Sequence, residues 1–243
     1  MSPELFPEMA AVQKRHWWFV GRRQILSCVI DRLQLPRQAN ILEIGCGTGA
    51  NLEMLRQKGH LHAMEFDDQA RAMANSLALC EVSAGGLPEP VTHMDQSMDL
   101  VCLLDVLEHV EDDLSALRRI ARLLKPGGRV LVTVPAYQWL WSPHDTAHHH
   151  YRRYTAHLLA QTAEQAGLTV HRIGYFNSLL FPLVAAVRLI GKLFSRKYSS
   201  DATLPSPWIN WLLLRIFVAE RHVVARIGFP MGTSVIAVLG ARP

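Results

Sequence analysis

The chain has 243 residues, of which 49% are hydrophobic and 19% charged, and its formal net charge is +4. This apolar content suffices for one core, so a single domain with an insertion fits the length and a second domain is not required. Four cysteines without C-x-x-C spacing argue against a disulfide framework or a zinc site and favour a reducing compartment. The first residues lack a basic segment followed by an apolar run, so we expect no signal peptide and a cytoplasmic protein.

The basic residues are dispersed in small groups, and no nucleic-acid-binding motif accompanies them. We therefore expect no nucleic acid as a partner. A mildly basic surface attracts an anionic lipid or a phosphorylated substrate equally well, so the charge alone does not choose between them. The sequence leaves the oligomeric state open.

Strands and helices alternate along most of the chain. Helical spacing of apolar residues from Ile25 to Leu33 predicts a helix closed by Pro36, and residues 40–44 form an apolar run typical of a buried parallel strand. The same patterns predict, in chain order, a helix at 52–59, a strand at 61–66, a helix capped by Asp67 or Asp68, a strand at 100–104, a helix at 114–124, a turn at 126–128, a strand at 129–134, a helix capped by Thr155, a strand from about Leu168 and a final strand at 234–239. This order predicts an α/β protein with a doubly wound, parallel sheet.

Residues 177–230 interrupt this alternation. Two apolar segments, 173–194 and 208–224, are joined by a polar linker at 195–207. Charges inside both segments, and Pro182 in the first, argue against transmembrane helices. We expect an inserted helical pair that forms a lid or lies at a membrane surface, with simple burial against the main domain as the alternative.

A glycine-rich turn follows the first predicted strand, with the sequence Glu43-Ile44-Gly45-Cys46-Gly47-Thr48-Gly49. Its G-x-G-x-G spacing differs from the G-x-G-x-x-G of a dinucleotide fingerprint, and Glu43 suits a cationic ligand better than a pyrophosphate. Glycines there permit positive φ angles and a close approach of ligand to backbone. Glu65, at the end of the next strand, is placed to accept hydrogen bonds from both ribose hydroxyls of a nucleoside. The alternatives are a tight turn with incidental glycines and an ordinary surface acid.

Three ordered segments resemble motifs of the S-adenosylmethionine-dependent methyltransferases with a Rossmann-like fold. They are ILEIGCGTG at 41–49, LVCLLDVLEHV at 100–110 and LLKPGGR at 123–129. The resemblance covers about residues 41–175, and the final strand fits as well. It implies a methyltransferase with a seven-stranded sheet, whose last strand runs antiparallel between strands five and six. It also implies that residues 177–230 lie in the connection between the last two strands.

The resemblance implies S-adenosylmethionine as the cofactor and assigns binding roles to individual positions. The residues that it places around the aminoacyl part and the sulfonium are those of the turn, Glu43, Gly45, Cys46, Gly47 and Gly49. It places Glu65 at the ribose and Phe66 against the adenine, and it places Leu104 and Asp105 beside the transferable methyl group. At the position where the family often has an acid near the adenine amine this chain has Ser83, so Ser83 or the backbone around Ala84 is expected to bind the adenine.

Two further segments are similar to bacterial methyltransferases of envelope or lipid-linked glycan biosynthesis. They are HWWFVGRR at 16–23 and the stretch from LWSPHD at 140–145 to HYRRY at 150–154. They favour a small or lipid-linked acceptor, and arginine forks in the second segment suit an anionic acceptor such as a sugar or polyprenyl phosphate. The residues expected to bind the acceptor are Trp18, Arg22, His144, Arg152, Arg153 and Tyr154. The alternatives are core packing for the tryptophan and internal salt bridges for the arginines.

A hydroxyl acceptor is helped by a general base. The candidates are His109, after strand four, and His144, His148, His149 or His150, in the loop expected after strand five; His150 is preferred among these four, and Asp105 lies beside the methyl group. For His109 a hydrogen bond to backbone is the competing role. No characteristic spacing accompanies His144, Asp145 and the histidine run, so we expect no metal. A non-catalytic binding module and an RNA or DNA methyltransferase remain alternative functions, while the glycine spacing disfavours an NAD-dependent dehydrogenase.

These observations predict four regions. They are an N-terminal helical cap at 1–39, a cofactor-binding core at 40–176, the apolar helical insertion at 177–230 and a final core strand at 231–243. We expect the insertion to bring the protein to the inner face of a membrane if it acts as a surface element.

Overall fold

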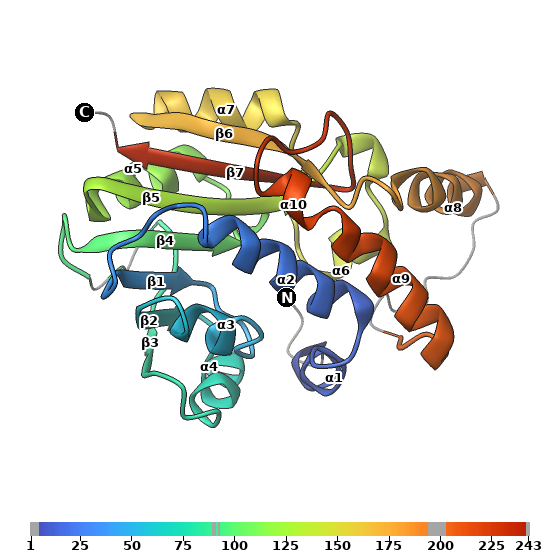
Figure 1. Ribbon diagram of the computed structural model, residues 1–243, viewed down its shortest axis with the longest axis horizontal. Coiled ribbons are helices and arrows are strands. Elements are labelled where there is room, and N and C mark those ends of the chain that lie inside the picture. The colour runs from blue at the N-terminus through green and yellow to red at the C-terminus, as the bar shows by residue number, and fades with distance from the viewer. Residues whose placement is uncertain (1–4, 89–90, 92, 194–202, 242–243) are drawn as a thin grey trace.

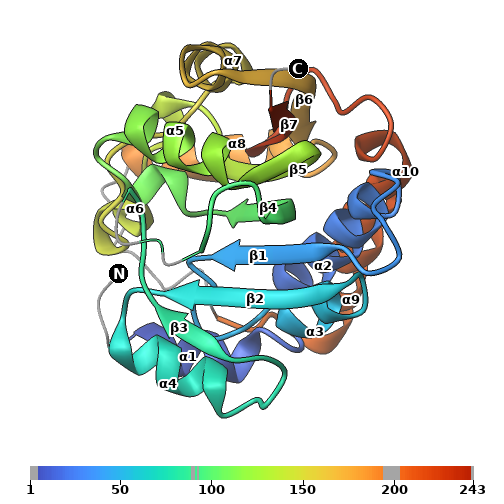
Figure 2. The same cartoon turned by 90° about the vertical axis from the view of Figure 1, so that its left-hand side faces the viewer.

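The computed structural model describes residues 5–88, 91, 93–193 and 203–241. Its centre is a seven-stranded sheet in the order β3-β2-β1-β4-β5-β7-β6. The last strand, β7 (Ser234–Ala241), is antiparallel to both of its neighbours, and the remaining strand pairs are parallel. Helices cover both faces of the sheet (Figures 1 and 2). The predicted doubly wound architecture, with its antiparallel last strand between strands five and six, is confirmed.

The first half of the sheet follows the predicted pattern closely. In chain order it contains β1 (Asn40–Ile44), α3 (Leu52–Arg56), β2 (His60–Glu65), α4 (Asp68–Asn75) and β3 (Val82–Ala84). Asp67 is the cap of α4, because its side chain accepts hydrogen bonds from the backbone N–H groups of Gln69 and Ala70. The sequence pattern did not locate β3, whose three residues are too few to show a period.

The second half continues with β4 (Met98–Leu104), the 3₁₀ turn η1 (Leu107–His109), α5 (Asp113–Leu123) and β5 (Leu124–Pro135). The predicted start of β5 at residue 129 is wrong. Leu124 already pairs with Met98, while Arg129 pairs with Leu100, so the Pro-Gly-Gly turn is an irregularity inside the strand. Gly127 has a φ of +81°, which accounts for a glycine at this position.

The connection after β5 is more ordered than a loop. It holds the 3₁₀ turn η2 (Gln138–Leu140) and the short helix α6 (Pro143–Ala147) before α7 (Ala156–Gln165) and β6 (Leu168–Phe176). Thr155 caps α7 as predicted, since its side chain accepts from the N–H of Leu158. His144 therefore lies in a helix, in contrast to the expected loop.

Two apolar layers sandwich the sheet, because alternate residues of a strand point to opposite faces. On one face α5 and α7 pack on a cluster that includes Leu42, Val101, Val130 and Ala237. On the other face lies α2 (Trp17–Ile30), with Ile41, Leu100, Leu131 and Ile236 beneath it. Burial on both faces explains why the strands read as continuous apolar runs. The N-terminal α1 (Leu5–Val12) precedes α2.

Between β6 and β7 the described residues form three helices: α8 (Phe181–Leu193), α9 (Pro207–Ala219) and α10 (Arg221–Val224). The expected apolar segment from residue 173 is wrong at its start, because Ile173 to Phe176 pair with β7. Most of the predicted polar linker at 195–207 lies outside the described residues, because residues 195–202 are not described. In Figure 1, α8 and the outer part of α9 stand at the end opposite to the one toward which β7 runs. They therefore extend from the edge formed by the carboxyl ends of the parallel strands.

Candidate functional site

The glycine-rich turn lies at the carboxyl edge of the sheet, between β1 and α3. Gly45, Gly47 and Gly49 all have positive φ angles, of 72°, 56° and 85°, which a side chain rarely adopts. A Cβ atom at Gly45 would lie 2.7 Å from a methyl of Val106, so that glycine is required by packing. A Cβ atom at Gly47 would meet nothing within 4 Å. The turn therefore leaves open space beside Gly47, where a ligand can approach the backbone.

Two carboxylates flank this turn. Glu65, at the end of β2, accepts hydrogen bonds from the N–H of Gly47 at 2.7 Å and from the N–H of Asp67 at 2.9 Å. Glu43, in β1, is buried and accepts from the side-chain amide of Asn51 at 2.8 Å through Oε1. Its other oxygen, Oε2, has no hydrogen-bond partner among the described residues. A buried acceptor without a partner is costly, so this oxygen is suited to a ligand's donor.

Arg22 reaches from α2 to the ends of β4 and β5. Its Nη2 lies 2.8 Å from Oδ2 of Asp105 and donates to Oγ1 of Thr133 at 2.9 Å, while Thr133 donates to the other oxygen of Asp105. Asp105 has a φ of +61°, a conformation unusual for a residue with a side chain. The Nε atom of Arg22 is buried and has no hydrogen-bond partner among the described residues. This network places a second unused polar atom near the turn.

Burial also sets the ionisation of the site. It raises the pKa of Glu43 to about 7, although the hydrogen bond from Asn51 and the charge of Arg22 act in the opposite direction. Glu43 therefore titrates near neutral pH. Its ionised form is stabilised by any cation that enters beside Oε2, and an ammonium or sulfonium is such a cation. Oε2 of Glu43 suits the ammonium of an amino-acid group, and Nε of Arg22 suits its carboxylate; both atoms lack a hydrogen-bond partner among the described residues.

The predicted adenine-binding residues lie at the ends of β2 and β3. Ala84 pairs with Glu65 across the two strands, so both lie at the same edge as the turn. Phe66 is 78% exposed, and its side chain lies against Gly86. The hydroxyl of Ser83 donates to the carbonyl of Ala63 at 3.3 Å. An exposed aromatic ring beside a glycine offers a flat apolar surface for a ligand.

A second group of side chains lies where η1 meets the segment after α6. The N–H of Tyr151 donates to the carbonyl of Glu108, and the rings of His109 and His150 are 4.6 Å apart. Ligand atoms of Glu108, His109 and His150 all lie within 4.8 Å of one another. Carboxylate and imidazole are donor types for transition metals, so these three side chains could hold a divalent ion. Burial and the nearby Asp105 raise the pKa of Glu108 well above its usual range, so a metal must first displace a proton.

Asp145 is the centre of this segment and is fully buried. Its two oxygens bind the guanidinium of Arg153, at 2.7 and 2.9 Å, and Oδ1 also lies 2.9 Å from Nδ1 of His150. The N–H of Ser142 donates to Oδ2. Burial by itself raises the pKa of Asp145, but the hydrogen bonds from His150 and Arg153 outweigh it and hold the pKa below its usual range.

These pairings change the interpretation of the two arginines. Arg153 uses its fork on Asp145, and Arg152 lies 2.8 Å from Asp113 and donates to the carbonyl of Glu111. Tyr154 is buried and donates to the same Asp113 at 2.7 Å. The expectation that these forks bind an anionic acceptor is not supported, because both are occupied by carboxylates of this chain. The alternative, internal salt bridges, describes the geometry.

Three histidines here, His109, His144 and His148, are neutral near pH 7. Burial lowers the pKa of His109 to about 3, with the charge of His150 as the next cause. Burial likewise lowers the pKa of His148 to about 3, and it lowers the pKa of His144 to about 4 even though Asp145 opposes the shift. His144 and His148 stack at 4.0 Å. They act as packed uncharged rings.

Trp18, predicted to bind the acceptor, packs between helices. Its ring stacks on Phe217 of α9 at 5.1 Å, and it lies 6.0 Å from Phe176 in a parallel orientation. These contacts hold α2 against α9 and favour the packing alternative for this residue. They also fix the helix from which Arg22 extends.

Three residues of the site were not singled out from the sequence: Asn51, Glu108 and Thr133. Asn51 is at the start of α3, a position where an amide is common for capping. Thr133 is one polar residue in the apolar run of β5, and Glu108 is an acid buried in an apolar stretch. A polar residue inside a predicted buried strand is a signal that could have identified Thr133.

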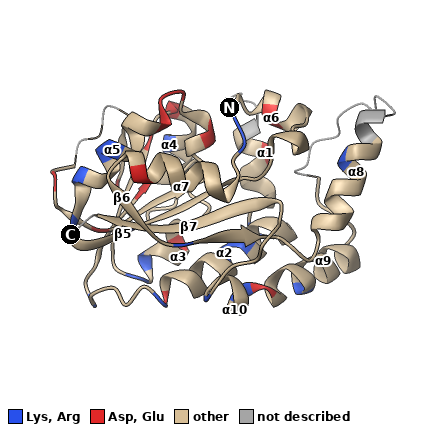
Figure 3. Ribbon diagram, turned by 90° about the horizontal axis from the view of Figure 1, so that it is seen from above, with Lys and Arg blue, Asp and Glu red and all other residues tan. Residues whose placement is uncertain are grey.

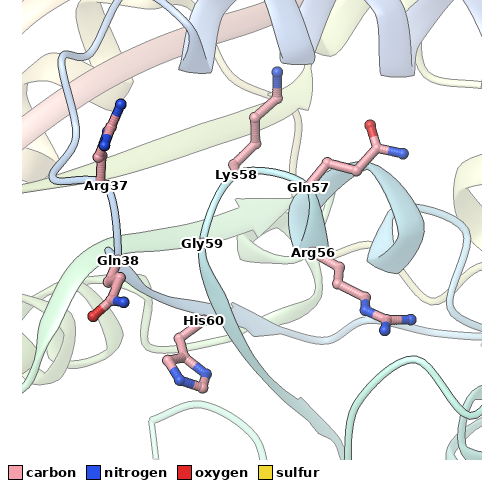
Figure 4. Close-up of a pocket in the computed structure, with 7 residues that line it drawn as sticks. All are labelled: Arg37, Gln38, Arg56, Gln57, Lys58, Gly59 and His60. Carbon is pink, nitrogen blue, oxygen red and sulfur yellow. The ribbon is translucent and has the colours of Figure 1, made fainter.

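A basic hollow of about 370 Å³ lies at the opposite edge of the sheet. Figure 4 shows its lining, which includes Arg37, Arg56 and His60. Because β1 and β2 begin here, the hollow is on the amino side of the strands, away from the glycine turn. It takes no part in the site described above.

The chain was compared with known proteins. A family profile described as "Methyltransferase domain" matches residues 19–173. An uncharacterised 37.1 kDa protein in transposon Tn4556 of Streptomyces fradiae is 28% identical over 190 residues, 70% of this chain and 54% of that protein. A ubiquinone biosynthesis O-methyltransferase of Aeromonas salmonicida is 32% identical over 99 residues, 38% of this chain and 42% of the relative. The chain thus spans about half the length, or less, of these curated relatives.

Among solved structures, one similar chain comes from a complex with the Trm112 methyltransferase activator of Haloferax volcanii. It superposes with a TM-score of 0.63 and 18% identity, covering 99% of this chain and 95% of that chain. At this identity the likeness concerns the fold. It extends over nearly the whole of both chains.

Proposed function

The chain belongs to the S-adenosylmethionine-dependent methyltransferases with a Rossmann-like fold, and from this premise we propose that it transfers a methyl group to a hydroxyl of a small or lipid-linked acceptor. The observation that carries the proposal is the carboxyl edge itself. There the open space at Gly47 lies beside Oε2 of Glu43 and Nε of Arg22, two buried atoms that have no hydrogen-bond partner in the part of the chain that the structure describes. The hydroxyl is supported by the similarity to O-methyltransferases of ubiquinone biosynthesis.

When bound, S-adenosylmethionine supplies an electrophilic methyl group on a sulfonium. Its aminoacyl part also has an ammonium and a carboxylate. Glu43 would bind the ammonium through Oε2, and Arg22 would donate from Nε to the carboxylate. Glu65 retains lone pairs for the ribose hydroxyls beside its two backbone bonds, and Phe66 covers the adenine. Arg22 thus serves the cofactor, and its earlier assignment to the acceptor is replaced.

In this proposal the acceptor binds between η1 and the stretch that contains Asp145 and His150. Asp145 holds the proton of His150 on Nδ1 and leaves Nε2 as the acceptor of a proton. The neutral His109 ring, at 4.6 Å, limits where the His150 ring can turn. A hydroxyl acceptor that gains the methyl group here would give its proton to Nε2 of His150, from which the proton would pass to solvent. Asp105 holds Arg22 in place beside the reacting methyl group.

The internal pairing of Arg152 and Arg153 favours an acceptor whose recognition is apolar over one bound by its phosphate. A lipid-linked acceptor meets this requirement through its chain. The exposed ring of Trp139 and the ring of Phe181, 6.1 Å apart, lie beside this segment and provide apolar surface.

Calorimetric titration with S-adenosylmethionine, S-adenosylhomocysteine and NAD tests the cofactor part of the proposal. We expect saturable binding of the two adenosyl ligands and none of NAD. Failure of both adenosyl ligands to bind folded protein would overturn the proposal.

The acceptor part is tested by transfer of labelled methyl groups to lipid extracts. His150→Ala is expected to reduce turnover at least a hundredfold, the usual contribution of a general base, while the affinity for S-adenosylmethionine changes little. Equal losses of turnover and affinity would show that His150 is structural.

A further inference from the structure

The outer faces of α8 and α9 expose large apolar side chains. On α8, Leu183, Val187 and Ile190 are 57%, 61% and 53% exposed, and their spacing places them along one side of the helix. Leu189, on another side of the same helix, is 49% exposed. On α9 the exposed residues Trp208, Trp211 and Leu212 form a similar stripe, with the two tryptophans 67% and 59% exposed. We call these two stripes together the outer face.

The outer face is exposed although both helices are firmly attached by their inner sides. Phe217 of α9 is buried against Trp18, and Asn210 of the same helix accepts from the N–H of Trp17 at 2.8 Å. On α8, Phe181 packs near Trp139, and Arg188 donates to the carbonyl of Leu140 at 2.6 Å. Each helix therefore has one side that binds the core and another that remains available.

The charge of this region is strongly one-sided. Residues 177–230 contain seven Lys or Arg and two Asp or Glu, a formal charge of +5, whereas the whole chain has +4. The rest of the protein is thus slightly acidic. Glu220 is buried and accepts hydrogen bonds from the N–H groups of Ser178 and Leu179, whereas Arg196, Lys197 and Asp201 all lie outside the described residues. Figure 3 shows basic residues on α8 and α9.

Basic and aromatic groups are adjacent on the outer face. The guanidinium of Arg215 lies 5.9 Å from the centre of the Trp211 ring. Tryptophan is enriched where a bilayer meets water, and long basic side chains reach from an apolar surface to anionic headgroups. A protein partner with an apolar surface would cover the exposed apolar residues of α8 and α9. Unless that partner were also acidic, the net charge of +5 on residues 177–230 would have no counterpart.

We infer that the outer face of α8 and α9 docks on an anionic lipid surface, lying in the interface without crossing it. Among the described residues no helix has the length and apolar character needed to span a membrane. Apolar residues on one side with basic residues beside them are typical of helices that lie in the plane of the interface.

Docking in this way connects the membrane with the site. Both helices extend from the carboxyl edge of the sheet (Figure 1). Helix α8 holds the segment of Asp145 through Arg188, and α9 holds α2, from which Arg22 extends. The acceptor site would therefore face the lipid surface, from which a lipid-linked acceptor enters. This last step rests on the proposed function, whereas the docking itself does not.

The test is co-sedimentation of the full chain with vesicles of phosphatidylcholine alone or with 30 mol% phosphatidylglycerol. We expect binding to the anionic vesicles that weakens as salt is added, and at least tenfold weaker binding to neutral vesicles. The double variant Trp208→Ala/Trp211→Ala is expected to lose at least tenfold in partition coefficient. Met94→Ala, which removes a side chain that is 79% exposed elsewhere, is the matched control and is expected to bind as the wild type does.

The charge is tested by Arg215→Gln against Arg118→Gln, an exposed arginine of α5. Only the first is expected to weaken binding to anionic vesicles. Failure to bind anionic vesicles, or full binding by the double tryptophan variant, would overturn the inference. Concentration-dependent dimerisation that the double variant abolishes, without vesicle binding, would assign the face to a second copy and overturn it too. Titration of the same variants with S-adenosylmethionine separates this result from the proposed function, because lipid docking does not require the cofactor.

Discussion

Arginines at the carboxyl edge of the sheet and arginines on the inserted helices differ in their environment. At the edge, three arginines are paired within the protein: Arg22 with Asp105, Arg152 with Asp113, and Arg153 with Asp145. In the insertion the exposed basic residue Arg215 lies over a tryptophan, and the one described acid is buried. By residue count, the basic charge of the whole chain therefore comes from residues 177–230. It does not indicate a phosphate site among the arginines of the core.

This difference predicts unequal costs of substitution in the two regions. Removing a partner in the core leaves a buried charge uncompensated, which costs far more than removing a solvated side chain. Substitutions at the buried ion pairs should therefore have the largest effects, and substitutions of exposed side chains on α9 the smallest.

Asp145→Asn is expected to lower the free energy of unfolding by about 3–5 kcal/mol, because Arg153 is left buried without a carboxylate. Denaturant unfolding measures this loss. The control is Asp68→Asn, whose carboxylate is 91% exposed and pairs with Arg71 at the surface. It is expected to cost about 0.5 kcal/mol or less. Similar losses in both variants would remove the distinction between the two kinds of pair.

The same aspartate predicts a pH dependence. Its pKa is held below the usual value, so the stabilisation that it contributes is present above about pH 4 and is lost as the pH falls toward the lowered pKa. The difference in stability between the wild type and Asp145→Asn should therefore shrink in acid. A difference that stays constant down to pH 2 would contradict this account.

Gly47→Arg is expected to reduce the affinity for S-adenosylmethionine at least a hundredfold, because the new side chain occupies the open space at the turn. The protein should remain folded, since no described atom lies within 4 Å of the new Cβ position and the positive φ of 56° costs a side chain only about 1–2 kcal/mol. Calorimetry and circular dichroism measure the two quantities. Gly47→Ala, with only a methyl group, should reduce affinity less. Unchanged affinity in the arginine variant would remove the site from this turn.

Glu43→Gln is expected to flatten the pH dependence of cofactor binding. With its pKa near 7, Glu43 becomes ionised as the pH rises through neutrality, so affinity in the wild type should increase roughly tenfold between pH 6 and 8. A raised carboxyl pKa also means that the ligand-free protein loses stability as the pH rises between about 4.5 and 7. In Glu43→Gln, both the rise of cofactor affinity with pH and the loss of stability of the ligand-free protein with pH should disappear. A variant with the wild-type slope would assign the titration to another group.

Trp208→Ala is expected to change the free energy of unfolding by about 0.5 kcal/mol or less in water, since its ring is 67% exposed. Trp18→Ala, which removes a ring stacked on Phe217, is expected to cost about 3 kcal/mol. Thermal unfolding without vesicles compares the two. A large loss for Trp208→Ala would show that the outer face is part of the core packing.

The sequence by itself determined the order of strands and helices, the glycine turn and the interruption at 177–230. These features depend on the period of apolar residues and on backbone freedom at glycine, which are local properties. It could not locate the three-residue β3, nor the early start of β5, because those depend on pairing with neighbouring strands.

Only the tertiary structure decided which charges meet. The arginines at 152 and 153 had the right chemistry for an anionic acceptor, yet both bind carboxylates of this chain. Arg22 and Thr133, from a helix and a strand far apart in the sequence, meet at Asp105. Residue type and spacing specify which interactions a side chain can make. The partner that it receives is specified by packing between distant segments, which no local pattern contains.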